Sequence, residues 1–162
     1  MMRRALRLCL LPLLIAGGAA PEAAAAPTVT VAVGDARLHA EVAATPEAHR
    51  RGLMGREHLG ADSGMLFVWR RSGSRTFWMK NTPLPLSVAF LDDRGRILNI
   101  EAMAPLREDR HYRSRGAARF ALEANRGWFR RHGVEPGDRC RFRIPAGLLP
   151  ARERGALVVG AP

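Results

Sequence analysis

Two neighbouring stretches of the chain alternate between hydrophobic and polar residues. Valine occupies every second position of residues 29–33, and apolar residues again fill every second position of residues 38–42. Because successive side chains of a strand point to opposite faces, this period of two predicts half-buried strands. Gly34 and Asp35 lie between the two stretches and are typical turn residues, so the sequence predicts a β-hairpin.

The next segment carries the signals of a short helix. Thr45 supplies a hydroxyl that can cap the first turn, Pro46 suits the first helical position, and Glu47 places an acid in the first turn. We expect this helix to end near Gly52 or Gly55.

The rest of the chain predicts short strands separated by turns. Residues 65–69 form a continuous apolar run, as expected for a strand covered on both faces. Residues 86–91 and 96–103 flank a polar turn sequence, which predicts a second hairpin. The other expected elements are a turn at 71–74, strands at 75–80, 117–123 and 139–144, a loop at 105–116, and a second short helix that Asn125 caps and that runs through Trp128 and Phe129.

About eight short strands and two short helices predict an all-β fold, a sandwich or a barrel, rather than alternating strand–helix units. Residues 26–145 are expected to form this single domain. Residues 146–162 are rich in Gly, Ala, Pro and Arg. We expect them to be a poorly ordered C-terminal tail.

Residues 1–25 predict export. Three arginines precede an apolar run from Leu8 to Ile15, and an alanine-rich stretch follows it. These are the three parts of a secretory signal peptide. The run is shorter than the roughly 20 apolar residues that span a bilayer. We expect cleavage near Ala25 and a periplasmic or secreted domain without a transmembrane segment. Cys9 starts the apolar run instead of following small residues at its end, which argues against a lipoprotein.

The chain is strongly basic, with 26 Lys and Arg against 15 Asp and Glu and a formal net charge of +11. Loss of the signal peptide leaves a net charge of about +9. The basic residues occur singly or in pairs without a long run, and export removes the chain from nucleic acid, so we expect no nucleic-acid partner. Anionic lipid headgroups or envelope polymers are the alternative to a merely solvated basic surface. We expect a monomer.

Cys140 is the only cysteine after residue 25, so the exported domain has no internal disulfide. It lies in a strictly alternating segment with Phe142 and Ile144, which predicts that all three face the core. We therefore interpret Cys140 as a core residue rather than a nucleophile.

Three segments in a fixed order have an unusual sequence: "RGLMGR" at 51–56, "GMLF" at 64–67 and "FWMKNT" at 77–82. Together with residues 90–92 and 122–127, they resemble the signature of the domain of unknown function 192 family, over roughly residues 28–145. The resemblance implies an all-β, jelly-roll-like sandwich, often exported in bacteria, and no established activity. Ser87 departs from the pattern, because many members carry aspartate at that position.

The "FWMKNT" segment and its surroundings supply a candidate ligand-binding site. Trp78 would offer an apolar plate, and the polar side chains beside it would suit a small polar or anionic ligand such as a sugar or an envelope fragment. In the structural alternative, Asn81 and Thr82 bond local backbone and fix a turn. Glu123 would join the site as an acceptor or pair with Arg56. The candidate residues are Arg56, Trp78, Lys80, Asn81, Thr82 and Glu123.

No catalytic residue, cofactor or metal is assigned from the sequence. The five histidines show no paired metal-ligand spacing. His49 and His58 flank Met54, so a soft-metal site with Met54 or Met79 is the minor alternative. The serine-containing turns lack a nucleophile-elbow pattern, and the paired acids Asp92-Asp93 lie in a predicted turn.

Three function classes remain open. The first is a non-catalytic periplasmic small-ligand-binding or accessory module. The second is an envelope hydrolase or carbohydrate-active enzyme that uses Glu123, which requires a second carboxylate or a histidine near it in a cleft. The third is a structural domain that binds another protein through an exposed sheet edge.

Overall fold

The structure, a computed structural model, describes residues 27–149 and 156–160, so the predicted signal peptide lies outside the described residues. The all-β fold is confirmed. The strands are β1 (Thr28–Val33), β2 (Ala36–Ala43), β3 (Ser63–Gly73), β4 (Thr76–Phe77), β5 (Leu86–Leu91), β6 (Ile97–Met103), β7 (Tyr112–Arg113), β8 (Ala118–Asn125), β9 (Cys140–Ile144) and β10 (Leu157–Val159). The helices are α1 (Pro46–Arg51), α2 (Trp128–Arg131) and the short 3-10 helix η1 (Ala146–Leu148).

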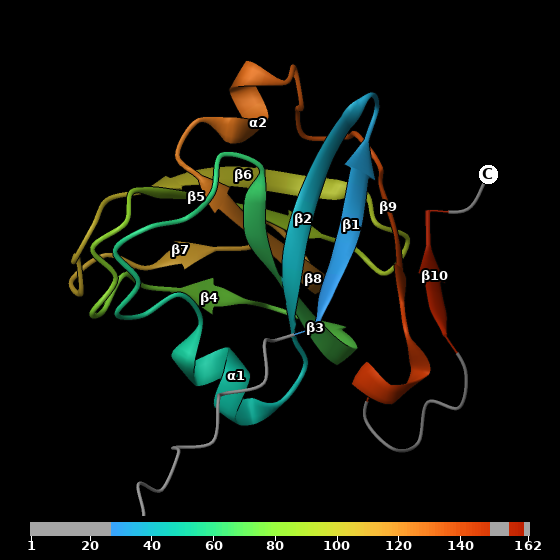
Figure 1. Ribbon diagram of the computed structural model, residues 1–162, viewed down its shortest axis with the longest axis horizontal. Helices are drawn as coiled ribbons and strands as arrows, with labels where there is room; N and C mark the ends of the chain where they lie inside the picture. The colour runs from blue at the N-terminus through green and yellow to red at the C-terminus, as the bar shows by residue number, and fades with distance from the viewer. Residues whose placement is uncertain (1–26, 150–155, 161–162) are drawn as a thin grey trace, which may run out of the picture.

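One large sheet dominates the fold (Figure 1). Its strand order is β10-β9-β1-β2-β3-β8-β5-β6, and β4 and β7 form a separate two-stranded sheet. Neighbouring strands are antiparallel except β2 and β3, which run parallel. The sheet curls until β9 approaches β6, where the Cys140 amide donates to the Gly95 carbonyl at 2.8 Å and Arg96 forms an isolated bridge with Arg139. Contact at this one point does not close the sheet into a barrel.

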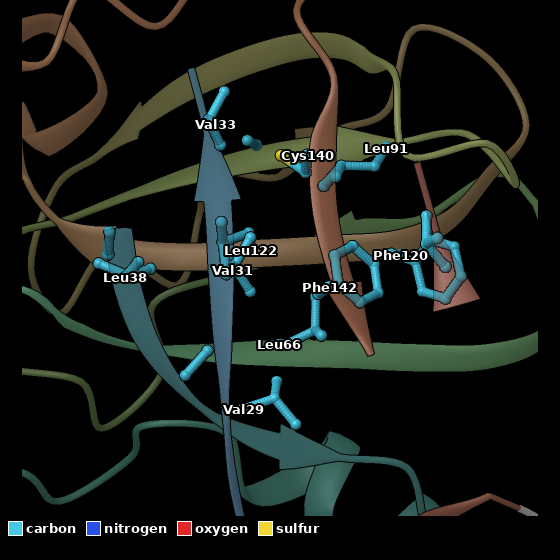
Figure 2. Close-up of a cluster of buried hydrophobic side chains, with 14 of the residues drawn as sticks. Val29, Val31, Val33, Leu38, Leu66, Leu91, Phe120, Leu122, Cys140 and Phe142 are labelled. Carbon is cyan, nitrogen blue, oxygen red and sulfur yellow. The ribbon is translucent and has the colours of Figure 1, made fainter. Parts of the chain in front are cut away.

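Because the sheet curls, it has an inner and an outer face, and a separate apolar cluster packs on each. The inner cluster joins β1, β2, β3, β8 and β9, with side chains such as Leu38, Leu66 and Phe120 meeting between the strands (Figure 2). The outer cluster contains Phe67 of β3 and Met79. Because strand residues alternate between faces, β8 sends Phe120, Leu122 and Ala124 to the inner cluster and Ala121 to the outer one.

The predicted first hairpin and first helix are confirmed. β1 and β2 pair in register around the turn at residues 34 and 35. At the start of α1, the Thr45 hydroxyl oxygen accepts a hydrogen bond from the Ala48 amide at 3.1 Å, and Pro46 takes the first position. The helix ends at Gly52, whose φ of 48° suits glycine.

We expect Thr45→Ala to lower the free energy of unfolding by about 1 kcal/mol, because the Ala48 amide loses its acceptor at the helix start. Thr45→Ser keeps a hydroxyl in the same place and is the matched control, with most of the stability retained. Urea denaturation of both variants checks this, and equal stability of the alanine and serine variants would contradict it.

The strand predicted at 75–80 is wrong beyond Phe77. β4 covers only two residues and pairs with β7, which itself lies inside the predicted loop at 105–116. The following residues form a turn held by backbone bonds from Met79 N to Arg107 O at 3.2 Å and from Leu106 N to Thr82 O at 3.0 Å. The preceding strand, β3, also runs through the turn predicted at 71–74.

Asn125 does not cap α2 as predicted. It is the last residue of β8, and its side-chain amide donates to the carbonyls of Leu59 at 3.2 Å and Gly60 at 2.8 Å. Gly127 stands directly before α2, without a side-chain cap. Asn125 therefore anchors the loop that leads into β3.

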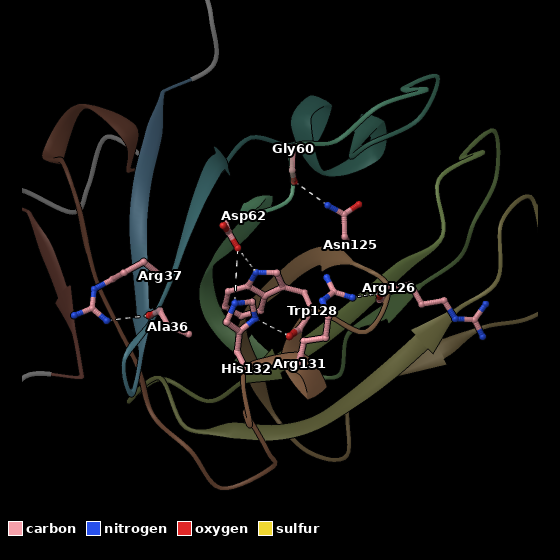
Figure 3. A network of polar contacts seen from close by, with 9 residues as sticks. All are labelled: Ala36, Arg37, Gly60, Asp62, Asn125, Arg126, Trp128, Arg131 and His132. Atoms are coloured by element: carbon pink, nitrogen blue, oxygen red, sulfur yellow. Dashed lines mark hydrogen bonds and ion pairs between the residues drawn. The ribbon is translucent and has the colours of Figure 1, made fainter.

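The same loop is tied to α2 (Figure 3). Trp128 donates its indole N–H to the Asp62 carboxylate at 2.9 Å, and Nδ1 of His132 lies 2.9 Å from the Trp128 carbonyl oxygen. The rings of Trp128 and His132 lie against one another, with centroids 4.3 Å apart. The polar groups of this network bond to one another, and they hold α2 against the end of the sheet.

The predicted disorder of the C-terminal tail is wrong for the described part of it. Residues 146–148 form η1, and Leu149 is buried in the inner cluster. The lone apolar run Leu157–Val159 forms β10, which pairs antiparallel with β9 and buries Val159. β10 thereby covers an edge of β9 that would otherwise be unpaired.

The alternation predicted for β9 is confirmed. Cys140, Phe142 and Ile144 are buried in the inner cluster, and the arginines between them are exposed. Burial, with a smaller effect of Asp138, raises the pKa of the Cys140 thiol to about 12. A thiol that stays protonated and buried is a core residue.

Candidate functional site

A cavity of about 380 Å³ opens on the outer side of the sheet, between α1, β3, β4 and β8. Three aromatic rings form one wall. Phe67 and Trp69 of β3 are stacked with ring centroids 6.0 Å apart, and Phe77 of β4 meets Phe67 edge-on at 4.8 Å. The wall is apolar and rigid, because each ring packs against another.

Glu123 lies at the buried end of this cavity. β8 places it between Met65 of β3 and Val88 of β5, its cross-strand neighbours, which are both buried. Its side chain is only 4% exposed, and its Oε2 atom has no hydrogen-bond partner among the described residues. An unpaired carboxyl in such surroundings costs free energy, so the fold does not use this group for its own stability.

The same burial determines the charge of Glu123. Loss of hydration disfavours the carboxylate and raises the pKa of Glu123 to about 8. The group is therefore mostly protonated at neutral pH. In that state it can both donate and accept a hydrogen bond inside the cavity.

The six residues predicted from the sequence divide into two groups. Trp78, Thr82 and Glu123 line the cavity together, whereas Arg56, Lys80 and Asn81 do not. The pairing of Arg56 with Glu123 is wrong, because both terminal nitrogens of Arg56 donate to the Glu41 carboxylate instead.

The residues of the turn serve mainly to hold it in place. Lys80 lies 5.3 Å from the ring centroid of Trp78 and 3.9 Å from a Glu108 carboxylate oxygen. The Asn81 carbonyl accepts a hydrogen bond from the Gly55 amide at 2.7 Å, and the Thr82 hydroxyl donates to the Lys80 carbonyl at 3.0 Å. The link from Gly55 to Asn81 joins the "RGLMGR" and "FWMKNT" segments, which explains why both surround one cavity.

Three arginines lie at the mouth of the cavity. Arg50 forms an exposed ion pair with Glu47 at 3.0 Å. Arg51 is exposed, and Arg75 lies with its guanidinium carbon 4.4 Å from the ring centroid of Trp69. Burial lowers the pKa of Arg75, but a guanidinium stays charged in proteins. The cavity thus has a cationic mouth and a protonated acid within.

His49 of α1 also lines the cavity. Its Nε2 atom lies 2.9 Å from the Ala43 carbonyl oxygen, and its ring centroid is 4.8 Å from that of Trp69. Burial lowers the pKa of His49, which favours the neutral imidazole. Among the described residues that line the cavity, Glu123 is the only carboxylic acid.

The aromatic wall and Arg75 were not predicted from the sequence, and His49 was considered only as a metal ligand. The run at 65–69 was correctly predicted to be a covered strand, which concealed that Phe67 and Trp69 share one face of it. The available signal was the pair of aromatic residues two positions apart, followed by the aromatic pair at 77 and 78.

A larger groove of about 720 Å³ lies on the other side of His49 and Trp69, toward Leu148 and Leu149. Its lining is mainly apolar, and Thr45, one of its polar members, is occupied in capping α1. No buried side-chain atom without a partner lies in it within the described part of the chain. The smaller cavity is therefore the better candidate for a functional site, because it contains the unpaired carboxyl of Glu123.

In residues 27–149 and 156–160, no three His, Cys, Asp or Glu side chains come together in a way that could hold a metal ion. No helix there is long and apolar enough to cross a membrane.

The family model of the domain of unknown function 192, described as "Uncharacterized ACR", matches residues 29–142. The chain belongs to this family. Within this domain of unknown function 192 chain, Ser87 replaces the aspartate expected from the resemblance. Ser87 lies on β5, and its hydroxyl oxygen accepts a hydrogen bond from the Gly127 amide at 3.1 Å, so this departure supports the start of α2 and does not line the cavity.

Two crystal structures of other proteins are similar to this chain. One is of a Sinorhizobium meliloti 1021 protein whose name suggests a transcription regulator, with 35% identity, a TM-score of 0.66, and coverage of 71% of this chain and 92% of that one. The other is of a protein of unknown function from Novosphingobium aromaticivorans DSM 12444, with 34% identity, a TM-score of 0.64, and coverage of 70% and 82%. No curated protein matches the chain.

Proposed function

We propose that this protein is an exported small-ligand-binding or accessory module, and that its site is the cavity around Glu123. The observation that carries the proposal is the unpaired carboxyl at the buried end of an aromatic-walled cavity. Export is inferred from residues 1–25, with their basic start, short apolar run and small-residue end.

A ligand hydroxyl or amino group that reaches Oε2 of Glu123 would remove the cost of leaving this group unpaired. The apolar face of the same ligand would stack on the aromatic wall and on Trp78, which is 43% exposed beside the cavity. Few polar groups in an otherwise aromatic cavity are typical of small-molecule sites. A sugar or an envelope fragment has both kinds of surface.

The name of the Sinorhizobium protein raises DNA binding as an alternative. The helices α1 and α2 of this chain have six and four residues. A helix-turn-helix protein reads the major groove with a recognition helix. Neither described α-helix is long enough to serve well in that role, which argues against recognition of DNA through a helix.

The proposal is tested by thermal and urea unfolding of the exported domain in the presence of envelope sugars, peptidoglycan fragments and anionic metabolites. A ligand at 100 times its dissociation constant is expected to add about 2.7 kcal/mol to the free energy of unfolding. Trp78→Ala should reduce this gain while the variant still folds.

Val158→Ala is the matched control, because Val158 is an exposed hydrophobic residue on β10, outside the cavity. It should keep the full ligand effect. A ligand effect of equal size in both variants would place binding elsewhere, and no effect with any compound class would reject the proposal.

One observation favours a second candidate, an enzyme that uses Glu123 as a general acid. A carboxyl with its pKa raised to about 8 keeps its proton at neutral pH, as a general acid must. The glycosidase mechanism with two facing carboxylates lacks its second acid among the described lining residues. Hydrolysis of aryl glycosides that is lost in Glu123→Gln would support this candidate, and equal rates in the variant would reject it.

A further inference from the structure

We propose that the ligand is bifunctional: a small organic anion that places its charged group on Arg75 and a hydroxyl or amino group on Glu123. The inference rests on the proposed function and names the chemical class of its ligand. It is carried by two ionisable side chains of opposite type, Arg75 and Glu123, which line one cavity and have no ionic partner among residues 27–149 and 156–160.

Arg75 is held in a fixed position at the mouth. Its Nε–H donates to the Ala118 carbonyl at 3.1 Å, and Nη2 donates to the Arg71 carbonyl. Its guanidinium lies over the Trp69 ring. Carbonyl and ring contacts orient the group but leave its charge unneutralised, and Nη1 donates to no described residue. A planar guanidinium with free donors suits a carboxylate or phosphate.

Some other arginines of the described chain have a carboxylate partner: Arg56 pairs with Glu41, Arg50 with Glu47, and Arg107 with Asp109. Others, such as Arg37, are exposed and donate to backbone carbonyls. Arg75 differs from these because it is partly buried, fixed by three contacts, and paired with no carboxylate in the described residues.

Glu123 complements Arg75 instead of pairing with it. The two side chains line the same cavity, but no ion pair joins them, and the carboxyl lies at the buried end with Oε2 unbonded. A neutral carboxyl offers both a donor and an acceptor, which suits a hydroxyl or an amine and not a second anion. The aromatic wall between the mouth and the buried end would contact the apolar body of the ligand.

Pairs of a sugar acid and its neutral parent distinguish the proposed contact with Arg75 from the proposed contact with Glu123. We would measure the binding of N-acetylmuramic acid against N-acetylglucosamine, and of galacturonic acid against galactose, by titration calorimetry with the exported domain. In each pair the acid adds a carboxylate and leaves hydroxyl groups for Glu123. We expect each acid to bind at least tenfold more tightly than its neutral parent, because charge-assisted hydrogen bonds are the stronger ones.

Arg75→Gln should reduce the preference for the acid to less than threefold, and Arg75→Lys should retain part of it because the charge remains. Arg143→Gln is the matched control, since it removes the same charge from an exposed position on β9, outside the cavity. It should leave the preference unchanged. Glu123→Gln should weaken acid and neutral sugar by the same factor.

Each result decides one of the two proposals. Equal binding of acid and neutral sugar by the wild-type protein overturns the bifunctional ligand and leaves the binding cavity standing. A preference that survives in Arg75→Gln overturns the role of Arg75. If Arg75→Gln does not fold, the folded Arg75→Lys variant decides, because an undiminished preference there rules out recognition by the guanidinium fork. Binding of neither member of any pair counts against the proposed function itself.

Discussion

Replacing Glu123 with glutamine is expected to flatten the dependence of stability on pH between about pH 4.5 and pH 8. Burial raises the pKa of Glu123 from its ordinary 4.5 to about 8 in the folded protein. Between these values only the folded state binds the proton. Stability therefore falls as pH rises, by about 1.4 kcal/mol for each pH unit. Below pH 4.5 both states are protonated, and this group no longer changes the stability.

The glutamine variant is neutral at every pH, so it escapes this loss and should be more stable than the wild type above pH 7. Urea denaturation at pH 5, 6, 7 and 8 measures the slope directly. Glu57→Gln, which changes an exposed glutamate outside the cavity, is the matched control and should keep the wild-type slope. If Glu123→Gln and Glu57→Gln show the same slope, Glu123 is not the group that titrates.

Gly64→Ala is expected to cost about 3 kcal/mol or more, the second large effect. A Cβ atom at this position would lie 2.2 Å from the Glu123 carbonyl oxygen and 2.8 Å from Cδ2 of Leu38. Gly64 is in the β3–β8 ladder opposite Ala124, so the neighbouring backbone can move away only by breaking strand pairing. Overpacking in such a place is among the larger causes of instability. The close approach of two strands thus explains the glycine of "GMLF".

Gly147→Ala provides the control for the glycine substitution. It makes the same chemical change in η1, where a Cβ atom would meet no atom within 4 Å. We expect its effect to stay within about 0.5 kcal/mol. Circular dichroism during urea denaturation compares the two variants with the wild type, and a Gly64→Ala protein as stable as Gly147→Ala would contradict the predicted clash.

The elements predicted correctly from the sequence are those that local signals determine. The first hairpin follows from alternation around Gly34, α1 from Thr45 and Pro46, and β9 from alternation around Phe142. In each case the residues that decide the element lie inside it or beside it. The tertiary packing of these elements is consistent with their local preferences.

The errors arose where the partner is distant in sequence. Residues 75–80 look like a strand in which Phe77 and Met79 face one way, but the Met79 amide finds its acceptor at Arg107. Asn125 looks like a helix cap, but its amide bonds to Gly60, on the loop before β3. β10 exists only because β9 offers it an edge. No short window of sequence contains these partners.

The candidate site was found in part for the same reason. Trp78 and Thr82 came from the unusual "FWMKNT" segment, and Glu123 from the segment at 122–127, as a candidate acceptor beside it. The sequence left open whether Arg56 pairs with Glu123, and the fold gives it Glu41 instead. Arg75 carried no local signal, because its half-buried place over the Trp69 ring, without a carboxylate partner in the described part of the chain, depends on the three-dimensional fold.

The cavity depends on the parallel pairing of β2 with β3. Two parallel strands need a long crossover, and here residues 44–62 carry α1 across the end of the sheet. The cavity takes one wall from this crossover, another from residues 67–82 and its buried acid from β8. Proteins that depend on contacts between segments so far apart in sequence fold slowly. A fragment without any one of these three segments would lack part of the cavity, so ligand capture would report that the three segments have come together.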